Sequence, residues 1–259
     1  MSWEEIERLT ALVQQLSPIE QISREQLNHV MVSAHSTMIE GSRVTVQSAF
    51  NFLVGDEAKV DKSLPWEGYD MLADHAQALD LALGLADEHQ LPTPSLLQKL
   101  AGTVMRTTGL KTNSILGSTD ASRGDFRLDK VSIMGASSFP NAQKVPALVE
   151  QLTQQLSTRM LQASSLQEQL HVAFDAHQQL VSIHPFNDGN GRTSRLLMNY
   201  VERFHGQPLT VVFREDKAAY FTALEISRQT DNMTPFREFM LEQHGKSLKH
   251  QLATPDFTT

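Results

Sequence analysis

One stretch of the sequence, residues 183–195 (IHPFNDGNGRTSR), contains most of the side chains that could carry chemistry. His184 has an imidazole whose ordinary pKa of about 6.5 suits removal of a proton from a hydroxyl near neutral pH. Asp188 supplies a carboxylate of the kind that Mg²⁺ binds together with phosphate oxygens and water. Gly189 and Gly191 leave the backbone free to direct N–H groups toward an anion. These residue types in one loop indicate transfer of a phosphate-linked group.

The elements on either side of this loop must hold it in place. Residues 166–183 have helical apolar spacing, and the helix is expected to end before Pro185 because helices commonly stop ahead of a proline. Residues 192–201 are rich in helix formers, so the loop is expected to open into a second helix whose N-terminus favours phosphate. Arg192 and Arg195 are three residues apart and share a face of that helix. They could therefore contact two successive phosphate groups.

The segment from His184 to Arg195 resembles the Fic family signature, H-P-F-x-[D/E]-G-N-G-R-x-x-R, at every specified position. Ser194 stands where relatives often have glycine, a change that a helix surface should tolerate. The resemblance implies a mainly α fold, a Fic-type helical bundle with a short β-hairpin flap over the active site. It also implies transfer of AMP from ATP to a Ser, Thr or Tyr hydroxyl of a target protein. The roles it implies are His184 as catalytic base, Asp188 as Mg²⁺ ligand, and nucleotide contacts from Asn187, Gly189, Asn190, Gly191, Arg192 and Arg195.

A second motif lies at the end of a helix expected over about residues 24–40, with Gly41 placed as a C-terminal capping glycine. Ser36 and Glu40 are four residues apart and project from one side of this helix, where the carboxylate could pair with the guanidinium of Arg195. The segment is similar to the Fic inhibitory motif, [S/T]-x-x-x-E-[G/N]. The resemblance implies autoinhibition, in which ATP binds with its α-phosphate poorly placed for attack. The alternative is an exposed glutamate beside a capping glycine.

Residues 109–141 form the longest stretch without a helical period. Gly124-Asp125-Phe126-Arg127 resembles the glycine-Phe-Arg element of the family, and apolar alternation after it predicts a short strand. The resemblance implies that this strand belongs to a flap that holds the target segment by main-chain pairing. The expected flap residues are Val131, Ser132, Ile133, Met134 and Gly135. The alternative is a surface hairpin that only covers core.

Tyr220 is similar to a family tyrosine that lines the adenine pocket, and its alternative is a tyrosine of the core. His177 lies seven residues before His184 on the same helix face and is expected to be a hydrogen-bonded core histidine.

The apolar pattern predicts a single domain over residues 1–259, with N-terminal helices in 1–41, a core over about 66–242 and a mobile tail over 243–259. Pro18 is expected to end the first helix. Residues 42–62 have a mixed pattern and are left unassigned. The remaining helices are expected over about 3–16, 66–85, 95–107, 146–164, 216–228 and 234–241.

Composition limits the classes of function. A formal net charge of −8 argues against broad nucleic-acid or membrane binding, and the absence of cysteine excludes disulfides and thiolate metal sites. No apolar run approaches the roughly 20 residues that span a bilayer, and the start lacks the pattern of a secretory signal, so a cytoplasmic protein is expected. The expected partners are ATP and a protein target. Self-modification and oligomer formation stay open.

Two other functions remain open from the sequence. The chain could remove AMP from a modified protein, with Glu40 positioning a water molecule. It could also be a nucleotide-binding or antitoxin-like regulatory module without activity.

Overall fold

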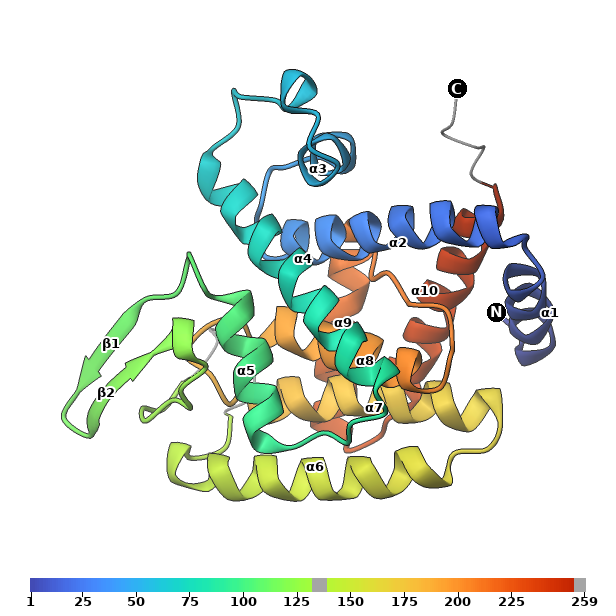
Figure 1. Ribbon diagram of the computed structural model, residues 1–259. Helices are drawn as coiled ribbons and strands as arrows, with labels where there is room; N and C mark the ends of the chain where they lie inside the picture. The colour runs from blue at the N-terminus through green and yellow to red at the C-terminus, as the bar shows by residue number, and fades with distance from the viewer. Residues whose placement is uncertain (132–138, 254–259) are drawn as a thin grey trace.

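Two helices that follow each other in the chain, α7 (Leu166–Ile183) and α8 (Asn190–Phe204), form the centre of the fold. The computed structural model describes residues 1–131 and 139–253, and its other helices surround this pair (Figure 1). Every residue from Arg192 to Glu202 is buried. A helix buried on all sides must find partners for its polar side chains inside the protein. α8 thus brings two arginines into the interior.

The remaining elements in the described part of the chain are eight α-helices, four three-residue 3-10 helices and one small sheet. The α-helices are α1 (Trp3–Gln14), α2 (Pro18–Ile39), α3 (Val46–Leu53), α4 (Trp66–Asp87), α5 (Pro94–Val104), α6 (Val145–Gln162), α9 (Lys217–Thr230) and α10 (Thr234–Ala253). The strands β1 (Lys111–Ser114) and β2 (Gly117–Asp120) form an antiparallel hairpin in which Lys111 pairs with Asp120. The expected mainly α class is confirmed.

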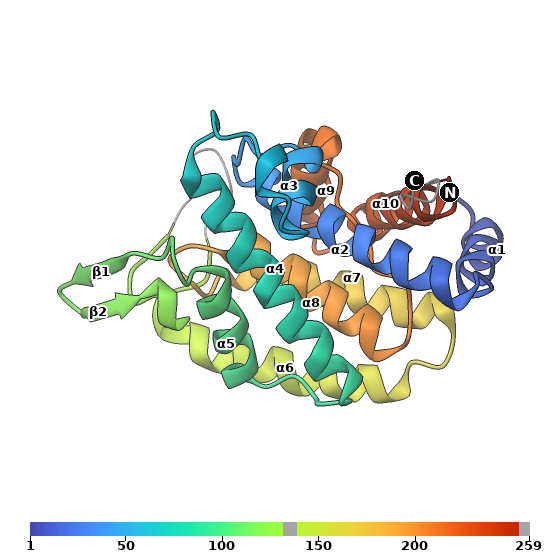
Figure 2. The same ribbon diagram turned by 45° about the horizontal axis from the view of Figure 1, so that its top comes forward.

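The helix α2 runs along one side of the bundle and packs against α4, α8 and the segment before α9 (Figures 1 and 2). It begins earlier than expected. Ser17 accepts from the backbone of Glu20 while the Glu20 side chain accepts from Ser17, and Pro18 occupies the first turn. Such a capping box with proline at the first helical position starts helices, so the prediction that Pro18 ends the preceding helix and that the next begins near Arg24 was wrong. The early start makes α2 a 22-residue helix. At its other end, Ser36 in the last turn contacts Arg195 of α8.

Other predictions also need correction. The unassigned stretch 42–62 contains α3, which is capped by Thr45. The last helix continues past Leu241 to Ala253, because Leu248 is buried and Ser247 accepts a hydrogen bond from the backbone of Val211. Residues 243–253 are therefore helical rather than a mobile tail, and residues 254–259 lie outside the described residues.

The described hairpin is not at the position expected for the flap. Val131 lies outside both strands, and Ser132, Ile133, Met134 and Gly135 lie outside the described residues.

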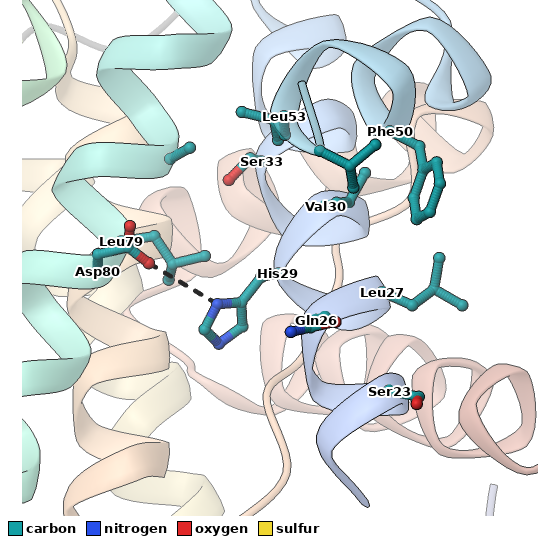
Figure 3. A pocket seen from close by; sticks show the side chains of 12 residues that line it. Ser23, Gln26, Leu27, His29, Val30, Ser33, Phe50, Leu53, Leu79 and Asp80 are labelled. Atoms are coloured by element: carbon teal, nitrogen blue, oxygen red, sulfur yellow. Dashed lines mark ion pairs between the residues drawn. The ribbon is translucent and has the colours of Figure 1, made fainter. Parts of the chain in front are cut away.

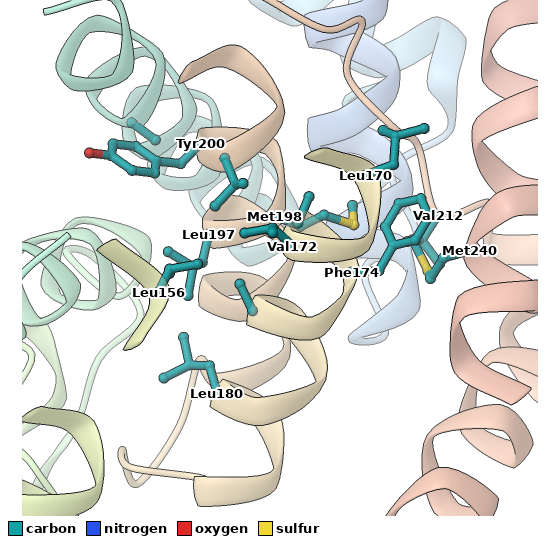
Figure 4. Packing of buried hydrophobic residues seen from close by; sticks show 14 of the residues in the cluster. Leu156, Leu170, Val172, Phe174, Leu180, Leu197, Met198, Tyr200, Val212 and Met240 are labelled. Atoms are coloured by element: carbon teal, nitrogen blue, oxygen red, sulfur yellow. The ribbon is translucent and has the colours of Figure 1, made fainter. Parts of the chain in front are cut away.

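The main core lies between α4, α5, α6, α7, α8 and α10. This core includes Leu156 of α6, Phe174 and Leu180 of α7, and Leu197 and Met198 of α8 (Figure 4). Burial on this scale holds α7 and α8 rigidly, which fixes the geometry of the loop that joins them. Within residues 1–131 and 139–253, no helix has both the length and the apolar character needed to cross a membrane.

Candidate active site

His184 stands at the end of α7 in the left-handed conformation, with φ of 52°. Its backbone N–H donates to the carbonyl of Leu180 at 3.0 Å, which closes the last turn of the helix. Burial lowers the pKa of its imidazole to about 4, and this outweighs a backbone hydrogen bond at Val181 that acts in the opposite direction. The ring is therefore uncharged at neutral pH and able to accept a proton.

The loop after His184 is held by the amide of Asn190. Its Oδ1 accepts from the backbone N–H of Phe186 at 2.9 Å, and its Nδ2 donates to the Phe186 carbonyl at 2.8 Å. Phe186 is buried and forms a backbone bridge with Phe126. Both ends of the Asn190 amide are thus committed to the loop, so its side chain shapes the site. The expected contact of Asn190 with the nucleotide stays a prediction, and its backbone N–H is the group that could make it. Asn187 is half-buried, and its Nδ2 donates to Oγ1 of the buried Thr119 on β2 at 2.6 Å.

Arg127 ties this loop to the preceding segment. Its side chain is 1% exposed, and its Nε donates to the carbonyl of His184 at 2.7 Å. Its remaining nitrogens donate to the carbonyls of Asp129 at 2.8 Å and Pro140 at 2.6 Å. The sequence marked this arginine only as part of a glycine-Phe-Arg element. An arginine within a nonhelical stretch was the one available signal for its role, and its carbonyl partners leave no pattern in the sequence.

The start of α8 forms an anion-binding surface. Gly189 takes φ of 78° and precedes the first turn, whose N–H groups have no partners within the helix. A Cβ atom on Gly191 would lie 2.5 Å from Glu40 Oε1. Only a glycine lets the Glu40 carboxylate come this close to the helix N-terminus. The carboxylate therefore lies where the loop would receive an anion.

Arg195 is joined to α2, as expected from the spacing of Ser36 and Glu40. Its Nε donates to Ser36 Oγ at 2.9 Å, and its Nη2 donates to the Ser36 carbonyl at 3.0 Å and to Glu40 Oε1 at 2.6 Å. Its Nη1 donates to Tyr220 Oη at 3.2 Å. Burial alone would raise the pKa of Glu40, but the charge and hydrogen bond of Arg195 outweigh it and hold that pKa below its ordinary value. The pair is therefore ionic at neutral pH.

Arg192 is also buried, but its hydrogen-bonding capacity is largely unused. Its Nη2 lies 3.0 Å from Met105 Sδ and 3.4 Å from Asp188 Oδ1, whereas its Nε and Nη1 have no hydrogen-bond partner among the described residues. Burying a guanidinium with unused donors is costly, and burial lowers the pKa of Arg192 although the charges of Asp188 and Glu40 act in the opposite direction. The unused donors indicate that an anion is the missing partner.

Asp188 is the one predicted metal ligand. Its side chain is 68% exposed, and its Oδ1 accepts from the backbone of Gly189 at 2.5 Å. Over the described ranges, no group of three or more His, Asp or Glu side chains could hold a metal ion by itself. A single accessible carboxylate fits Mg²⁺ when phosphate oxygens and waters supply the other ligands.

Tyr220 is 1% exposed and supports Arg195 from the side opposite α2. Its hydroxyl lies 2.9 Å from His177 Nε2 and accepts from Arg195. His177 is a buried, hydrogen-bonded histidine, as expected. In this arrangement Tyr220 acts as a core tyrosine, and its expected contact with adenine stays a prediction.

A cavity of about 610 Å³ lies between α2, α3 and α4, where His29 faces Asp80 at 3.8 Å (Figure 3). None of the predicted site residues lines it. The candidate active site is therefore the loop between α7 and α8, covered by the last turn of α2.

Comparisons with known proteins identify the family of the chain. The model of the Fic/DOC family matches residues 93–201, which include the whole loop. The chain is 31% identical over 224 residues to protein adenylyltransferase Fic of Drosophila persimilis, covering 86% of this chain and 41% of that protein. It thus spans about two fifths of the length of the curated relative.

Solved structures share the fold. A Fic-domain-containing signaling protein from Bacteroides thetaiotaomicron superposes with a TM-score of 0.80 at 20% identity, covering 96% of both chains. Fic-1 from C. elegans superposes with a TM-score of 0.77 at 19% identity, covering 96% of this chain and 70% of the other. The signature loop, the helical architecture and the matched relatives agree: the chain belongs to the Fic/DOC family.

Proposed function

We propose that this protein transfers AMP from ATP to a Ser, Thr or Tyr hydroxyl of a target protein. The observation that carries the proposal is that an uncharged His184 stands at the start of the loop, while the buried Arg192, with unused donors, lies in the first turn of α8 that follows it. A neutral base and an unsatisfied cation are what an incoming hydroxyl and a polyphosphate require. The name of the curated relative, protein adenylyltransferase Fic, supports the same reaction. The proposed reaction needs ATP, which agrees with the cytoplasmic location expected from the sequence.

In this reaction the residues of the loop and of the first turn of α8 would have the following roles. His184 accepts the proton of the target hydroxyl as its oxygen bonds to the α-phosphorus, and the bond to the β-phosphate oxygen breaks to release pyrophosphate. Arg192 and the N–H groups at the start of α8 stabilise the charge on the phosphates. Asp188 would hold Mg²⁺, which would supply positive charge to neutralise the phosphates.

The contact between α2 and α8 would regulate this reaction. Arg195 has to meet the terminal phosphate of ATP for the α-phosphate to be in line with the attacking hydroxyl. Its guanidinium is instead engaged by Ser36 and Glu40. A carboxylate in this position also repels phosphate. The protein as described would therefore be inhibited, and loss of the Glu40 carboxylate would release it.

The test compares the parent, Glu40→Gly and Glu40→Gly/His184→Ala after incubation with Mg²⁺ and ATP labelled on the α-phosphate. Label should appear on protein chiefly with Glu40→Gly and should vanish when His184 is also replaced. If the label persists when His184 is replaced, His184 is not the base of the reaction.

The same variants separate the alternatives. If the parent removes AMP from a modified protein and Glu40→Gly abolishes this, Glu40 has a catalytic role in AMP removal. If ATP binds but Glu40→Gly labels no protein, itself included, the chain is a binding module.

A further inference from the structure

The imidazole of His184 is stacked against the ring of Phe139. The ring centroids are 4.1 Å apart and the planes differ by 23°. Phe139 is 7% exposed, so the contact is shielded from water. A buried stack of this kind limits rotation of the imidazole and removes solvent from one of its faces.

A single arginine holds the backbone on both sides of this stack. Arg127 donates through Nε to the carbonyl of His184 at 2.7 Å and through Nη2 to that of Pro140, the neighbour of Phe139, at 2.6 Å. Because the guanidinium is planar and rigid, it fixes the spacing between the two carbonyls. The distance between Phe139 and His184 is thus set by a hydrogen-bonded frame.

The outer face of Phe139 is also covered. The guanidinium carbon of Arg228, on α9, lies 4.8 Å from the ring centroid, and Arg228 forms an ion pair with Glu225 one turn earlier. The Phe139 ring therefore lies between the guanidinium of Arg228 and the imidazole of His184. This arrangement places a cation on the far side of the ring that contacts the base.

We propose that Phe139 is a positioning residue for His184, which fixes the orientation of the imidazole and keeps it in the neutral form that accepts the target proton. This inference rests on the proposed function, because it concerns the base of that reaction. The charged groups that act on the imidazole are Arg127 and Arg228, which disfavour its protonation, and Glu40 on α2, which favours it. The stack with Phe139 excludes water from the imidazole, which disfavours its protonation further.

The proposal predicts a change in the rate of chemistry without a change in ATP binding. Phe139→Leu keeps an apolar side chain but loses the stack. In the Glu40→Gly background it should lower kcat roughly tenfold, since a misplaced base loses part of its contribution, while KM for ATP stays within about twofold. The acid limb of the pH profile of kcat should move upward, toward the ordinary histidine pKa of about 6.5, because the imidazole is less buried without the ring. Phe139→Tyr keeps the ring, so kcat and the acid limb of its pH profile should stay as they are in Glu40→Gly alone.

The matched control is Phe204→Leu. Phe204 also contacts a histidine, His89, with ring centroids 5.0 Å apart, but at the other end of α8. Its replacement should change neither kcat nor the pH profile.

A readout that does not need activity separates this inference from the proposed function. The pKa of His184 can be followed by NMR of ring-labelled histidine in the otherwise unchanged protein. It should rise in Phe139→Leu and stay low in Phe139→Tyr. If Glu40→Gly transfers no AMP, the proposed function fails while this titration still tests the stack. An unchanged pKa in Phe139→Leu, or a raised KM for ATP with unchanged kcat, would overturn the inference.

Discussion

Replacing Glu40 by glutamine should release the enzyme by an amount that can be estimated from the contact. The substitution keeps the size of the side chain and removes its charge. Arg195 is 3% exposed and Glu40 is 31% exposed, so the 2.6 Å contact is screened less than a surface pair. A hydrogen bond to a charged group contributes about 1.5–3 kcal/mol. If this energy holds the inhibited state, its loss should raise the rate of AMP transfer roughly 10- to 150-fold.

The assay is the initial rate of protein labelling from ATP labelled on the α-phosphate, at saturating ATP and Mg²⁺. Ser36→Ala should give a smaller increase, because it removes the hydroxyl that accepts from Arg195 Nε but leaves the Ser36 carbonyl in place. Glu7→Gln, which changes an exposed glutamate of α1, serves as the matched control and should behave like the parent. Equal rates for Glu40→Gln and the parent would refute the argument that this ion pair holds the inhibited state.

Three further outcomes follow from the site and its surroundings. Asp188→Asn should reduce transfer at least roughly tenfold and raise the Mg²⁺ concentration needed for half-maximal rate, whereas an unchanged Mg²⁺ dependence would exclude Asp188 as ligand. Arg192→Met should weaken ATP binding in calorimetry yet raise the melting temperature, because it removes a buried cation whose Nε and Nη1 have no hydrogen-bond partner among the described residues and whose ion pair with Asp188 is long, at 3.4 Å; a lower melting temperature would contradict this. His35 and His244 have pKa values lowered by burial to about 4, so their stabilising effect is present above the ordinary pKa of about 6.5 and is lost as pH falls toward 4, at up to about 1.4 kcal/mol per pH unit for each. Burial raises the pKa of Glu202 to about 7, which acts in the opposite sense between pH 4.5 and 7, but a single carboxyl offsets only one histidine. The urea midpoint should therefore be lower at pH 5 than at pH 7, and an equal or higher value would contradict the burial of these groups.

Local patterns predicted the central part of the molecule well. The helices α7 and α8 and the loop between them follow from apolar periodicity, a proline stop and two glycines, which all act over a few residues. The contact of Glu40 with Arg195 also followed, since opposite charge selected the partner, whereas the hydrogen bond from Arg195 to Ser36 was not predicted. These features depend on short-range geometry or on a single opposite charge.

Features that depend on distant contacts could not be predicted in this way. Nothing in the order of residues shows that Phe139 stacks on His184 or that Arg127 joins their backbones, because these pairs are separated by many residues and meet only through tertiary packing. The C-terminal extension of α10 was missed because its stripe is weakly apolar. Its stability comes from partners such as Val211, which only the fold brings near.

The most direct test of the central claim identifies the group that is transferred. Glu40→Gly should be incubated with Mg²⁺ and ATP labelled either on the α-phosphate or on the γ-phosphate. Transfer of AMP should label protein from the α-labelled nucleotide alone, with the γ-label recovered in pyrophosphate. Labelling of protein from the γ-phosphate would show phosphate transfer and would contradict attack by a target hydroxyl on the α-phosphorus.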